Sequence, residues 1–382
     1  MLNQRKNEVF LPQAMLDEHY VGKLYGRHFG ASGVFNVFSR EIMQTHSFDS
    51  VLIGQILQEK PDITCPEWEQ DWIEQNLLVG YWDEDAFVFH YKGEPFSVRP
   101  YDLVQNIFSR NTGILESGIM KDKCAFLLGC GSVGSLIALE LARAGVGNFV
   151  LIDNDVVEYH NICRHQCSIL DVGGYKVHAV AKRIWEINPT ATVECVPNIV
   201  EEVGRRVFDT YCKNAILIGC ADNRMADVYA NEIAIAYGVP FLSVGFWERA
   251  FAGEIFYHLP NQGMPCYKCA LGDGGEFAQR QNANRRIYTN EEDLTQVSFE
   301  PGISADINFV TTIGVKLALD ILNIGNEEFT PRLLNHLRQY TLVCNTNDPK
   351  IGGEMAEIFS YPLQVTTSLK VERSNSCTSC GE

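Results

Sequence analysis

The sequence predicts an α/β protein whose central sheet is mostly parallel. Three observations predict it. Short apolar runs alternate with amphipathic segments of helical length from about residue 123, a glycine-rich turn joins the first run to the first such segment, and the chain is 382 residues long. Strands that alternate with helices form parallel, Rossmann-like sheets through right-handed crossovers. The length fits two domains, or one large domain with extensions.

The expected strands of this region cover residues 124–128, 149–152, 192–196, 215–218, 241–244, 254–258 and 340–344. One expected helix follows the glycine-rich turn and stops at Gly145, and two others cover 177–187 and 225–237. Ser304 is expected to cap a further helix. The buried face of that helix is marked by Val310, Ile313, Leu317 and Ile321.

Residues 1–115 are expected to form a small α+β module of winged-helix character, with helices at 51–58 and 66–78 and a strand at 86–91. Its many aromatic residues leave two interpretations open. Exposed aromatics and edge strands bind an extended peptide by strand addition, or the aromatics form the module's own core. The other domains are expected at 116–345 and 346–382, with a long mobile loop at 271–303.

The charge balance excludes whole classes of partner. The chain has 31 basic and 48 acidic residues and a net charge of −17, whereas general nucleic-acid and anionic-membrane binders neutralise phosphates with Lys and Arg. The start lacks the apolar run of a signal peptide, and no uncharged apolar stretch has the length of a membrane span. Its 13 cysteines indicate reduced thiols and metal ligands. The sequence therefore predicts a cytoplasmic protein with no nucleic-acid or membrane partner.

A glycine-rich loop at 129–134 has the pattern of a nucleotide-binding turn. Gly129, Gly131 and Gly134 follow an expected strand and open an expected helix, so backbone N–H groups and the helix N-terminus can approach a phosphate. Asp153 lies at the end of the next strand, where a carboxylate accepts hydrogen bonds from ribose hydroxyls. This pattern alone fits NAD as well as ATP, and it also fits a tight strand–helix turn without a ligand.

The residues that follow favour a nucleoside triphosphate over NAD. Asn161, Arg164 and Lys176 come in succession, and three phosphates need several donors and cations. Asp222 follows the strand at 215–218, in the crevice where open sheets bind ligands. A carboxylate there suits Mg²⁺, which is held by one or two protein oxygens together with phosphates.

Two C-x-x-C pairs indicate a metal site. Cys266 and Cys269 form one pair, and Cys377 and Cys380 form the other. Four thiolates close the tetrahedral shell of a structural Zn²⁺, which would fix the C-terminal tail. The alternative, a redox C-x-x-C, requires a helix N-terminus after a strand, and the tail shows no such pattern.

The order of these motifs resembles the adenylating enzymes that include ThiF, MoeB and the ubiquitin-activating enzymes. The resemblance covers about residues 125–345 together with the cysteine pairs. It implies ATP as cofactor, Asp153 on the ribose with Asp155 as a ribose or metal neighbour, and Mg²⁺ on Asp222. The nucleotide residues that it implies are Gly129, Gly131, Gly134, Asp153, Asp155, Asn161, Arg164 and Lys176. His165 stands where the family has a glutamine.

The element from Phe108 to Asn111 resembles another motif of this family, in which an arginine reaches ATP across a homodimer interface. The resemblance implies that Arg110 acts in trans in a homodimer. The residues before the nucleotide loop make the layout similar to microcin C-type peptide adenylating enzymes. Those have an N-terminal peptide clamp of winged-helix character, the same zinc pairs and no thioester cysteine. Here residues 270–343 contain no cysteine, and Cys344 is the first candidate for a thioester.

These observations predict an enzyme that uses ATP to convert the carboxylate of a ribosomally made peptide into an acyl-adenylate, as in antibiotic maturation. Catalysis would come from positioning and charge neutralisation by Arg110, Arg164, Lys176 and Mg²⁺ on Asp222. The second hypothesis is an activating enzyme for a ubiquitin-like or sulfur-carrier protein. The third is an NAD-binding oxidoreductase or an inactive nucleotide-binding subunit.

Overall fold

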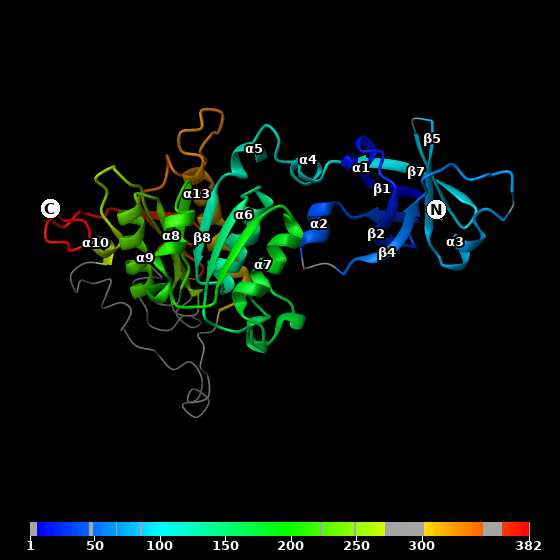
Figure 1. Ribbon diagram of the computed structural model, residues 1–382. Coiled ribbons are helices and arrows are strands. Elements are labelled where there is room, and N and C mark those ends of the chain that lie inside the picture. Colours follow the sequence, from blue (N-terminus) through cyan, green and yellow to red (C-terminus); the bar gives the residue numbers. More distant parts are fainter. Residues whose placement is uncertain are drawn as a thin grey trace, which may run out of the picture. The chain divides into compact units, whose positions relative to one another are not determined.

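The structure is a computed structural model that describes residues 6–381 except 46–48, 66, 85, 222–223, 248–249, 272–301 and 347–360. The chain divides into two compact units, Met1–Arg110 and Asn111–Glu382 (Figure 1). The division falls slightly before the boundary expected near residue 115. The loop expected at 271–303 and its arginines lie almost wholly outside the described residues.

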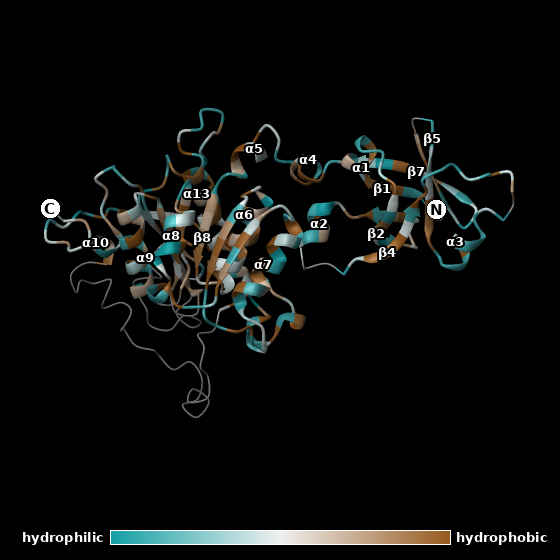
Figure 2. Cartoon of the chain, in the orientation of Figure 1, coloured by the Kyte–Doolittle hydropathy of each residue, from teal (hydrophilic) through white to brown (hydrophobic). Residues whose placement is uncertain are grey.

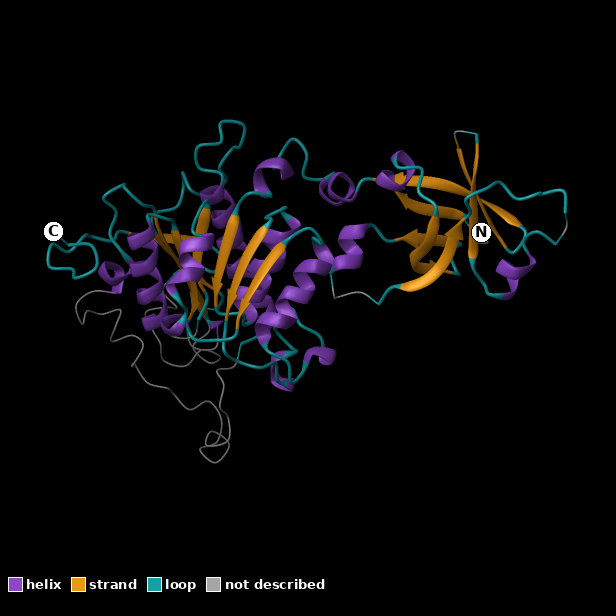
Figure 3. Cartoon of the chain, viewed as in Figure 1, coloured by secondary structure: helices purple, strands orange, loops and turns teal. Residues whose placement is uncertain are grey.

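The N-terminal unit is a closed β-barrel with the strand order β1-β3-β2-β4-β5-β6-β7 (Figure 3). β7 returns to pair with β1, which closes the barrel. The strands are β1 (Glu8–Pro12), β2 (Gly22–Phe29), β3 (Val34–Val37), β4 (Val51–Ile56), β5 (Leu78–Asp83), β6 (Ala86–Tyr91) and β7 (Glu94–Tyr101), and the short helices are α1 (Gln13–Asp17), α2 (Arg40–Gln44), α3 (Gln70–Glu74) and α4 (Leu103–Phe108).

The expected winged-helix character of this unit is wrong, although the strand expected at 86–91 is confirmed as β6. The segment expected as a helix at 51–58 contains strand β4, and the one at 66–78 contains only the short α3. The spacing of the apolar residues at 51–58 suits a helix, but the β-branched side chains of Val51, Ile53 and Ile56 favour a strand. Gly54 also requires the close approach of a neighbouring strand, since a Cβ there would lie 2.4 Å from the Leu78 carbonyl oxygen.

The aromatic residues of this unit form much of its own core, as one of the two interpretations held. Phe35, Phe87, Phe89 and Phe96 are buried together with aliphatic side chains inside the barrel. The other interpretation, strand addition, needs a free sheet edge, and the strands that the structure describes close into a barrel without one. A peptide that binds this unit must therefore be recognised through side chains on its surface.

The second unit contains an eight-stranded sheet with the order β10-β9-β8-β11-β12-β13-β14-β15. The first five strands of this order are parallel and the last three pair antiparallel, so the predicted mostly parallel α/β sheet is confirmed. The strands are β8 (Cys124–Leu128), β9 (Asn148–Ile152), β10 (Thr192–Val196), β11 (Ala215–Gly219), β12 (Phe241–Phe246), β13 (Ala252–His258), β14 (Tyr340–Cys344) and β15 (Thr366–Leu369).

Helices cover both faces of this sheet and bury its apolar strands (Figure 2). One face packs against α6 (Ser132–Arg143), α7 (Lys176–Ile187) and α13 (Ser304–Leu322). The other face packs against α8 (Arg205–Tyr211), α9 (Arg224–Tyr237) and α10 (Tyr267–Leu271). The remaining helical turns are α5 (Ser117–Met120), η1 (Tyr159–Asn161), η2 (Ile169–Asp171) and η3 (Val200–Glu202).

The expected capping role of Ser304 is wrong. The residue before the helix is Ile303, which has no side-chain acceptor, and Ser304 is the first helical residue. Its hydroxyl oxygen instead accepts a hydrogen bond from the Asn308 amide at 3.1 Å. None of the helices that the structure describes is long and apolar enough to cross a membrane.

Candidate functional site

A cavity of about 290 Å³ opens where β8, β9, β10 and β11 reach their carboxyl ends. β8 and β11 are neighbours in the sheet, although two strands and two long helices separate them in sequence, so their crossovers leave in opposite directions. Open α/β sheets bind ligands at such a switch point. The described lining residues are Leu128, Gly129, Gly131, Ile152, Asp153, Asn154, Asp155, Lys176, Asn198, Ile199, Val200, Glu201, Cys220, Ala221 and Ala226.

The glycines of the loop at 129–134 serve two purposes. A Cβ at Gly134 would lie 1.9 Å from the Gly129 carbonyl oxygen, and one at Gly129 would lie 2.7 Å from the Cys220 carbonyl oxygen, so these two glycines allow the turn to pack. A Cβ at Gly131 would meet nothing closer than the His165 ring at 4.0 Å. Gly131 therefore leaves open space toward the cavity, directly before α6.

The start of α6 offers unpaired backbone donors to this space. Gly131 is the residue before the helix, and no side chain caps the helix N-terminus. The first N–H groups of a helix have no partners within it, and the helix dipole adds partial positive charge there. The loop and α6 together can therefore hold a phosphate, as the glycine pattern predicted.

Asp153 connects the end of β9 to the glycine loop. Its two carboxylate oxygens accept hydrogen bonds from the backbone N–H groups of Cys130 at 2.7 Å and Asp155 at 2.8 Å. Burial raises the pKa of Asp153 above its usual value, while the N–H of Cys130 and the nearby Lys176 oppose that shift. Each carboxylate oxygen keeps a second lone pair, so the residue can still accept a hydrogen bond from a ligand hydroxyl.

Lys176 is the one cation among the described lining residues, which include three carboxylates, Asp153, Asp155 and Glu201. Its ammonium pairs with the Asp155 carboxylate at 2.7 Å, and its side chain is only 12% exposed. A β-bridge between Val156 and Tyr175 brings these two segments together. The backbone N–H of Lys176 also donates to the Asp155 carbonyl at 2.9 Å. The cation is therefore held in place before any ligand binds.

Asn161 and Arg164 are not among the lining residues. Asn161 is buried, and its side-chain oxygen accepts a hydrogen bond from the Glu158 N–H at 2.8 Å, which closes the turn η1. The Arg164 guanidinium lies near Gly302, two residues before α13 begins, where a Cβ would meet its Nη1 at 3.6 Å. Burial, with Lys176 and Arg164 nearby, lowers the pKa of His165 to about 4, so this imidazole is neutral at pH 7.

Two other predicted residues lie at boundaries. Asp222 is outside the described residues, between Ala221, which lines the cavity, and α9, which begins at Arg224. Arg110 is exposed and ends the first unit. Next to it, the Asn111 amide donates to the Arg143 carbonyl at 2.9 Å and holds the start of the second unit to the end of α6.

One wall of the cavity was not expected from the sequence. Asn198, Ile199, Val200 and Glu201 line it from the segment that follows β10. Their position directly after a parallel strand, at the same sheet edge as the glycine loop, is the signal that identifies them. Their residue types alone, a polar pair around two aliphatic side chains, give no comparable indication.

The four predicted metal ligands lie together. The sulfur atoms of Cys266, Cys269, Cys377 and Cys380 are all within 4.8 Å of one another. The Cys266–Cys377 and Cys269–Cys380 pairs are 3.5 Å apart, and the Cys266–Cys269 pair is 3.8 Å apart. A disulfide needs about 2.05 Å, whereas a ZnS₄ tetrahedron with bonds of about 2.3 Å places its sulfurs about 3.8 Å apart. The four thiols therefore fit one zinc ion, which would join α10 to the C-terminal tail.

Cys344 does not have the surroundings of a reactive thiol. It is 1% exposed in β14, and burial raises the pKa of its thiol above the usual 9.0. Nucleophilic cysteines instead have a lowered pKa and access to solvent.

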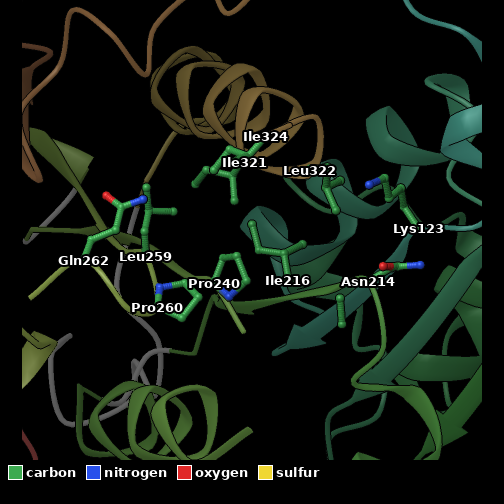
Figure 4. Close-up of a pocket in the computed structure, with 11 residues that line it drawn as sticks. Lys123, Asn214, Ile216, Pro240, Leu259, Pro260, Gln262, Ile321, Leu322 and Ile324 are labelled. Atoms are coloured by element: carbon green, nitrogen blue, oxygen red, sulfur yellow. The ribbon is translucent and has the colours of Figure 1, made fainter. Parts of the chain in front are cut away.

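A second cavity, of about 240 Å³, lies at the amino ends of the parallel strands β8, β11 and β12 (Figure 4). Ile321, Leu322 and Ile324 at the end of α13 face Ile216, Pro240 and Leu259 across it. Lys123 is its one charged lining residue, and it has no glycine loop or helix N-terminus. Of these two cavities, only the first has residues of the glycine loop among its described lining residues.

Most of the second unit is similar to proteins that are already known. A model of the ThiF family matches residues 117–352, more than half of the chain. The adenylyltransferase and sulfurtransferase MOCS3 of Sus scrofa is 30% identical over 171 residues, 43% of this chain and 36% of that protein. The sulfur carrier protein ThiS adenylyltransferase of Bacillus subtilis is 29% identical over 158 residues, 40% of this chain and 45% of that protein. The matched region thus spans less than half of each relative.

A solved structure of Escherichia coli MccB with ATP aligns over 72% of this chain and 74% of that chain, with a TM-score of 0.50 and 18% identity. At this identity the likeness shows the fold alone.

Proposed function

The chain belongs to the ThiF family, and from this premise we propose that it is an adenylyltransferase that uses ATP to activate the carboxylate of a ribosomally made peptide. The observation that supports this most is the cavity at the carboxyl ends of the parallel strands, where a glycine loop, Asp153 and Lys176 meet. The N-terminal barrel is proposed to hold the peptide.

In the proposed reaction a carboxylate oxygen of the substrate attacks the α-phosphorus of ATP. An oxygen–phosphorus bond forms, the bond to the β,γ-phosphates breaks, and pyrophosphate leaves with the displaced charge. The attacking carboxylate is already ionised, so no general base is needed, and catalysis consists of positioning and charge neutralisation. The glycine loop and Lys176 would hold phosphates and Asp153 the ribose.

Asp155, Asn161 and Arg164 are proposed to join the nucleotide site when ATP binds. Lys176 would exchange part of its contact with Asp155 for a phosphate, and the neighbouring Asn161 and Arg164 would turn toward the phosphates. Asp222 would hold Mg²⁺, which neutralises the leaving group when bound. Arg110 would approach the phosphates from a second copy of the chain.

The second candidate is an activating enzyme for a ubiquitin-like or sulfur-carrier protein. Its support is the similarity to a relative that is a sulfur carrier protein adenylyltransferase. Both candidates share the adenylation step and differ in the protein or peptide that presents the carboxylate. The burial of Cys344 favours adenylation without transfer to that thiol.

ATP–pyrophosphate exchange by the pure protein tests the proposal. We expect exchange with a short ribosomally made peptide encoded beside this gene, and none with a carrier protein that ends in Gly-Gly. Replacing Asp222 by alanine should abolish exchange without changing thermal unfolding. Exchange driven only by the carrier would select the second candidate, and full exchange by the Asp222 variant would contradict the assignment of the magnesium ligand.

The homodimer is proposed from an apolar surface between β9 and α7. Tyr159, Ile169 and Leu170 are 74%, 64% and 86% exposed there, and Val156 and Tyr175 are also exposed. Exposed apolar residues that gather in one segment mark a site of protein association. Sedimentation equilibrium should give twice the mass of one chain, and a monomer at micromolar concentration would contradict the donation of Arg110 in trans.

Zinc is proposed for the cysteine cluster. Metal analysis of protein purified without chelator should give about one zinc per chain. Replacing Cys380 by serine should remove the metal, while the same change at Cys212, outside the cluster, should retain it. Protein that is folded and free of zinc would contradict the proposal.

A further inference from the structure

One row of outward side chains crosses four neighbouring strands of the N-terminal barrel. Arg99 in β7 is aligned with Phe10 in β1, Phe10 with Asn36 in β3, and Asn36 with Arg27 in β2. The residues that alternate with them, among them Val9 and Phe35, point into the barrel core. These four residues, here called the arginine row, therefore share the outer face.

The geometry of the strands sets the spacing of the two arginines. Neighbouring strands lie about 4.8 Å apart, so the backbones of Arg99 and Arg27 are separated by about 14 Å. An extended chain advances about 3.3 Å per residue, so this distance corresponds to about four residues of a bound peptide. Such a peptide would run across the strands, since the closed barrel offers no edge for it to extend.

The arginine row combines two cations with an apolar centre. The Arg99 guanidinium lies 5.3 Å from the centre of the Phe10 ring. Its contact with Glu8 is long, at 3.7 Å, and the Arg99 side chain is 62% exposed, whereas that of Glu8 is 24% exposed. Arg27 is exposed and has no ion pair among the described residues. Both guanidinium groups are therefore accessible to a carboxylate, which they can bind in the paired geometry typical of arginine.

The net charge of the N-terminal unit indicates which kind of anion the arginine row can bind. Residues 1–110 contain 9 Lys and Arg but 16 Asp and Glu, a net charge of −7. This excess opposes a long polyanion such as single-stranded nucleic acid, whose binding needs a continuous basic track. Two isolated arginines in an acidic unit instead suit two isolated carboxylates.

We propose that the arginine row binds an extended acidic peptide segment, in which two carboxylates about four residues apart flank an apolar side chain seated on Phe10. The proposal rests on the proposed function for the identity of the peptide, which would be the substrate. It adds that the substrate carries such an acidic segment, held by side chains on the barrel.

Fluorescence anisotropy with the full chain tests the proposal. The probe is a labelled peptide, Ser-Asp-Gly-Leu-Gly-Asp-Ser, and the control peptide has Asn in place of both Asp residues. We expect the Asp peptide to bind and the Asn peptide to bind at least tenfold more weakly. Arg27→Gln and Arg99→Gln should each weaken binding of the Asp peptide about tenfold. Arg40→Gln is the matched control, because Arg40 is exposed in the same unit but pairs with Glu18 and lies outside the row.

A charge exchange separates recognition from loss of fold. Arg27→Glu should lose the Asp peptide and gain a peptide in which one Asp is replaced by Lys. Equal binding of the Asp and Asn peptides overturns the proposal, and so does tighter binding of oligothymidylate through the same arginines. ATP–pyrophosphate exchange is measured on the same preparation. Exchange with no binding by the row would refute this inference alone, whereas binding without exchange would refute the proposed function alone.

Discussion

Replacing Lys176 by alanine is expected to lower kcat/KM for ATP–pyrophosphate exchange by about a hundredfold or more, with no loss of the fold. A group that neutralises charge developing on a reacting phosphate or oxyanion typically contributes about 10²–10³-fold in rate. Lys176 is the one cation among the described residues that line the cavity, and three carboxylates line it too. Without it, the leaving pyrophosphate would face mainly negative charge on the side of the cavity that the structure describes.

The Lys176→Ala variant should lose more activity than the removal of one phosphate contact would cause. Asp155 now pairs with the Lys176 ammonium at 2.7 Å, and the substitution would leave that carboxylate unpaired beside the phosphates. We therefore expect both a higher KM for ATP and a lower kcat. Added Mg²⁺ should recover part of the KM effect, because a divalent cation can neutralise the released carboxylate, but it should not restore kcat.

Lys182→Ala is the matched control. Lys182 lies in the same helix, α7, and pairs with Asp171 at 3.2 Å, but it does not line the cavity. Its loss should leave exchange within about twofold of the unchanged protein, because a partly exposed ion pair contributes only about 0–1 kcal/mol. Equal losses in both variants would show that α7 acts through its stability and that Lys176 has no role in the chemistry.

The sequence predicted the second unit well because two independent signals agree there. Its central strands β8 and β11 are continuous apolar runs, as strands buried on both faces must be, and glycine-rich or polar turns separate them from the helices. The glycine loop and Asp153 could be placed because they follow β8 and β9 directly. The Lys176–Asp155 ion pair could not, since it depends on the bridge between Val156 and Tyr175.

The N-terminal unit was predicted less well because its strands are short and carry an ambiguous pattern. In β4 the buried residues Ile53 and Ile56 are three positions apart, a spacing that also suits a helix. Closure of the barrel depends on pairing between β1 and β7, about 90 residues apart in sequence, and local patterns do not report such pairing. The outward arginine row has the same origin, because it exists only once four strands are in register.

The other large effect concerns stability, and it arises from a buried carboxyl group in α9. Asp227 is 4% exposed, and one of its oxygens accepts a hydrogen bond from the Ser243 hydroxyl at 2.6 Å. The other oxygen has no hydrogen-bond partner among the described residues. It lies close to Gly219, where an added Cβ would be only 2.3 Å from it. Burial is the main cause that raises the pKa of Asp227 to about 7.

Neighbouring charges do not reverse this shift. Glu254 raises the pKa of Asp227 further, and Arg224 lowers it. Arg224, however, forms its ion pair with Glu254, at 2.9 Å. Asp227 also lies near Ser243, Tyr267 and the Cys220 thiol, none of which is a cation. Among the described residues, Arg224 is the cation that lowers its pKa. The native protein therefore holds Asp227 protonated at mildly acidic pH.

Asp227→Asn is expected to stabilise the second unit relative to the unchanged protein as pH rises. The unfolded carboxyl ionises near its usual 3.8 and the native one near 7. Below both values Asp is neutral in either state. Between them the unfolded state alone gives up its proton, so the stability of the unchanged protein falls as pH rises, and the loss levels off above about pH 7. From pH 5 to pH 8 the relative loss should be about 2–3 kcal/mol.

Urea unfolding at pH 5 and pH 8, followed by tryptophan fluorescence, measures this difference, and Asp209→Asn is the control because Asp209 is an exposed carboxylate in α8. The Asn side chain keeps an oxygen that can accept from Ser243, and any new hydrogen bond from its amide N–H groups would be present at both pH values. Only the difference between the gains at pH 8 and pH 5 is therefore assigned to the ionisation of Asp227. If the unchanged protein and Asp227→Asn instead show parallel pH dependences, Asp227 is ionised in the native state. Arg224 would then have to serve two buried carboxylates at once, and α9, which begins at Arg224, would carry a buried negative charge in its first turn.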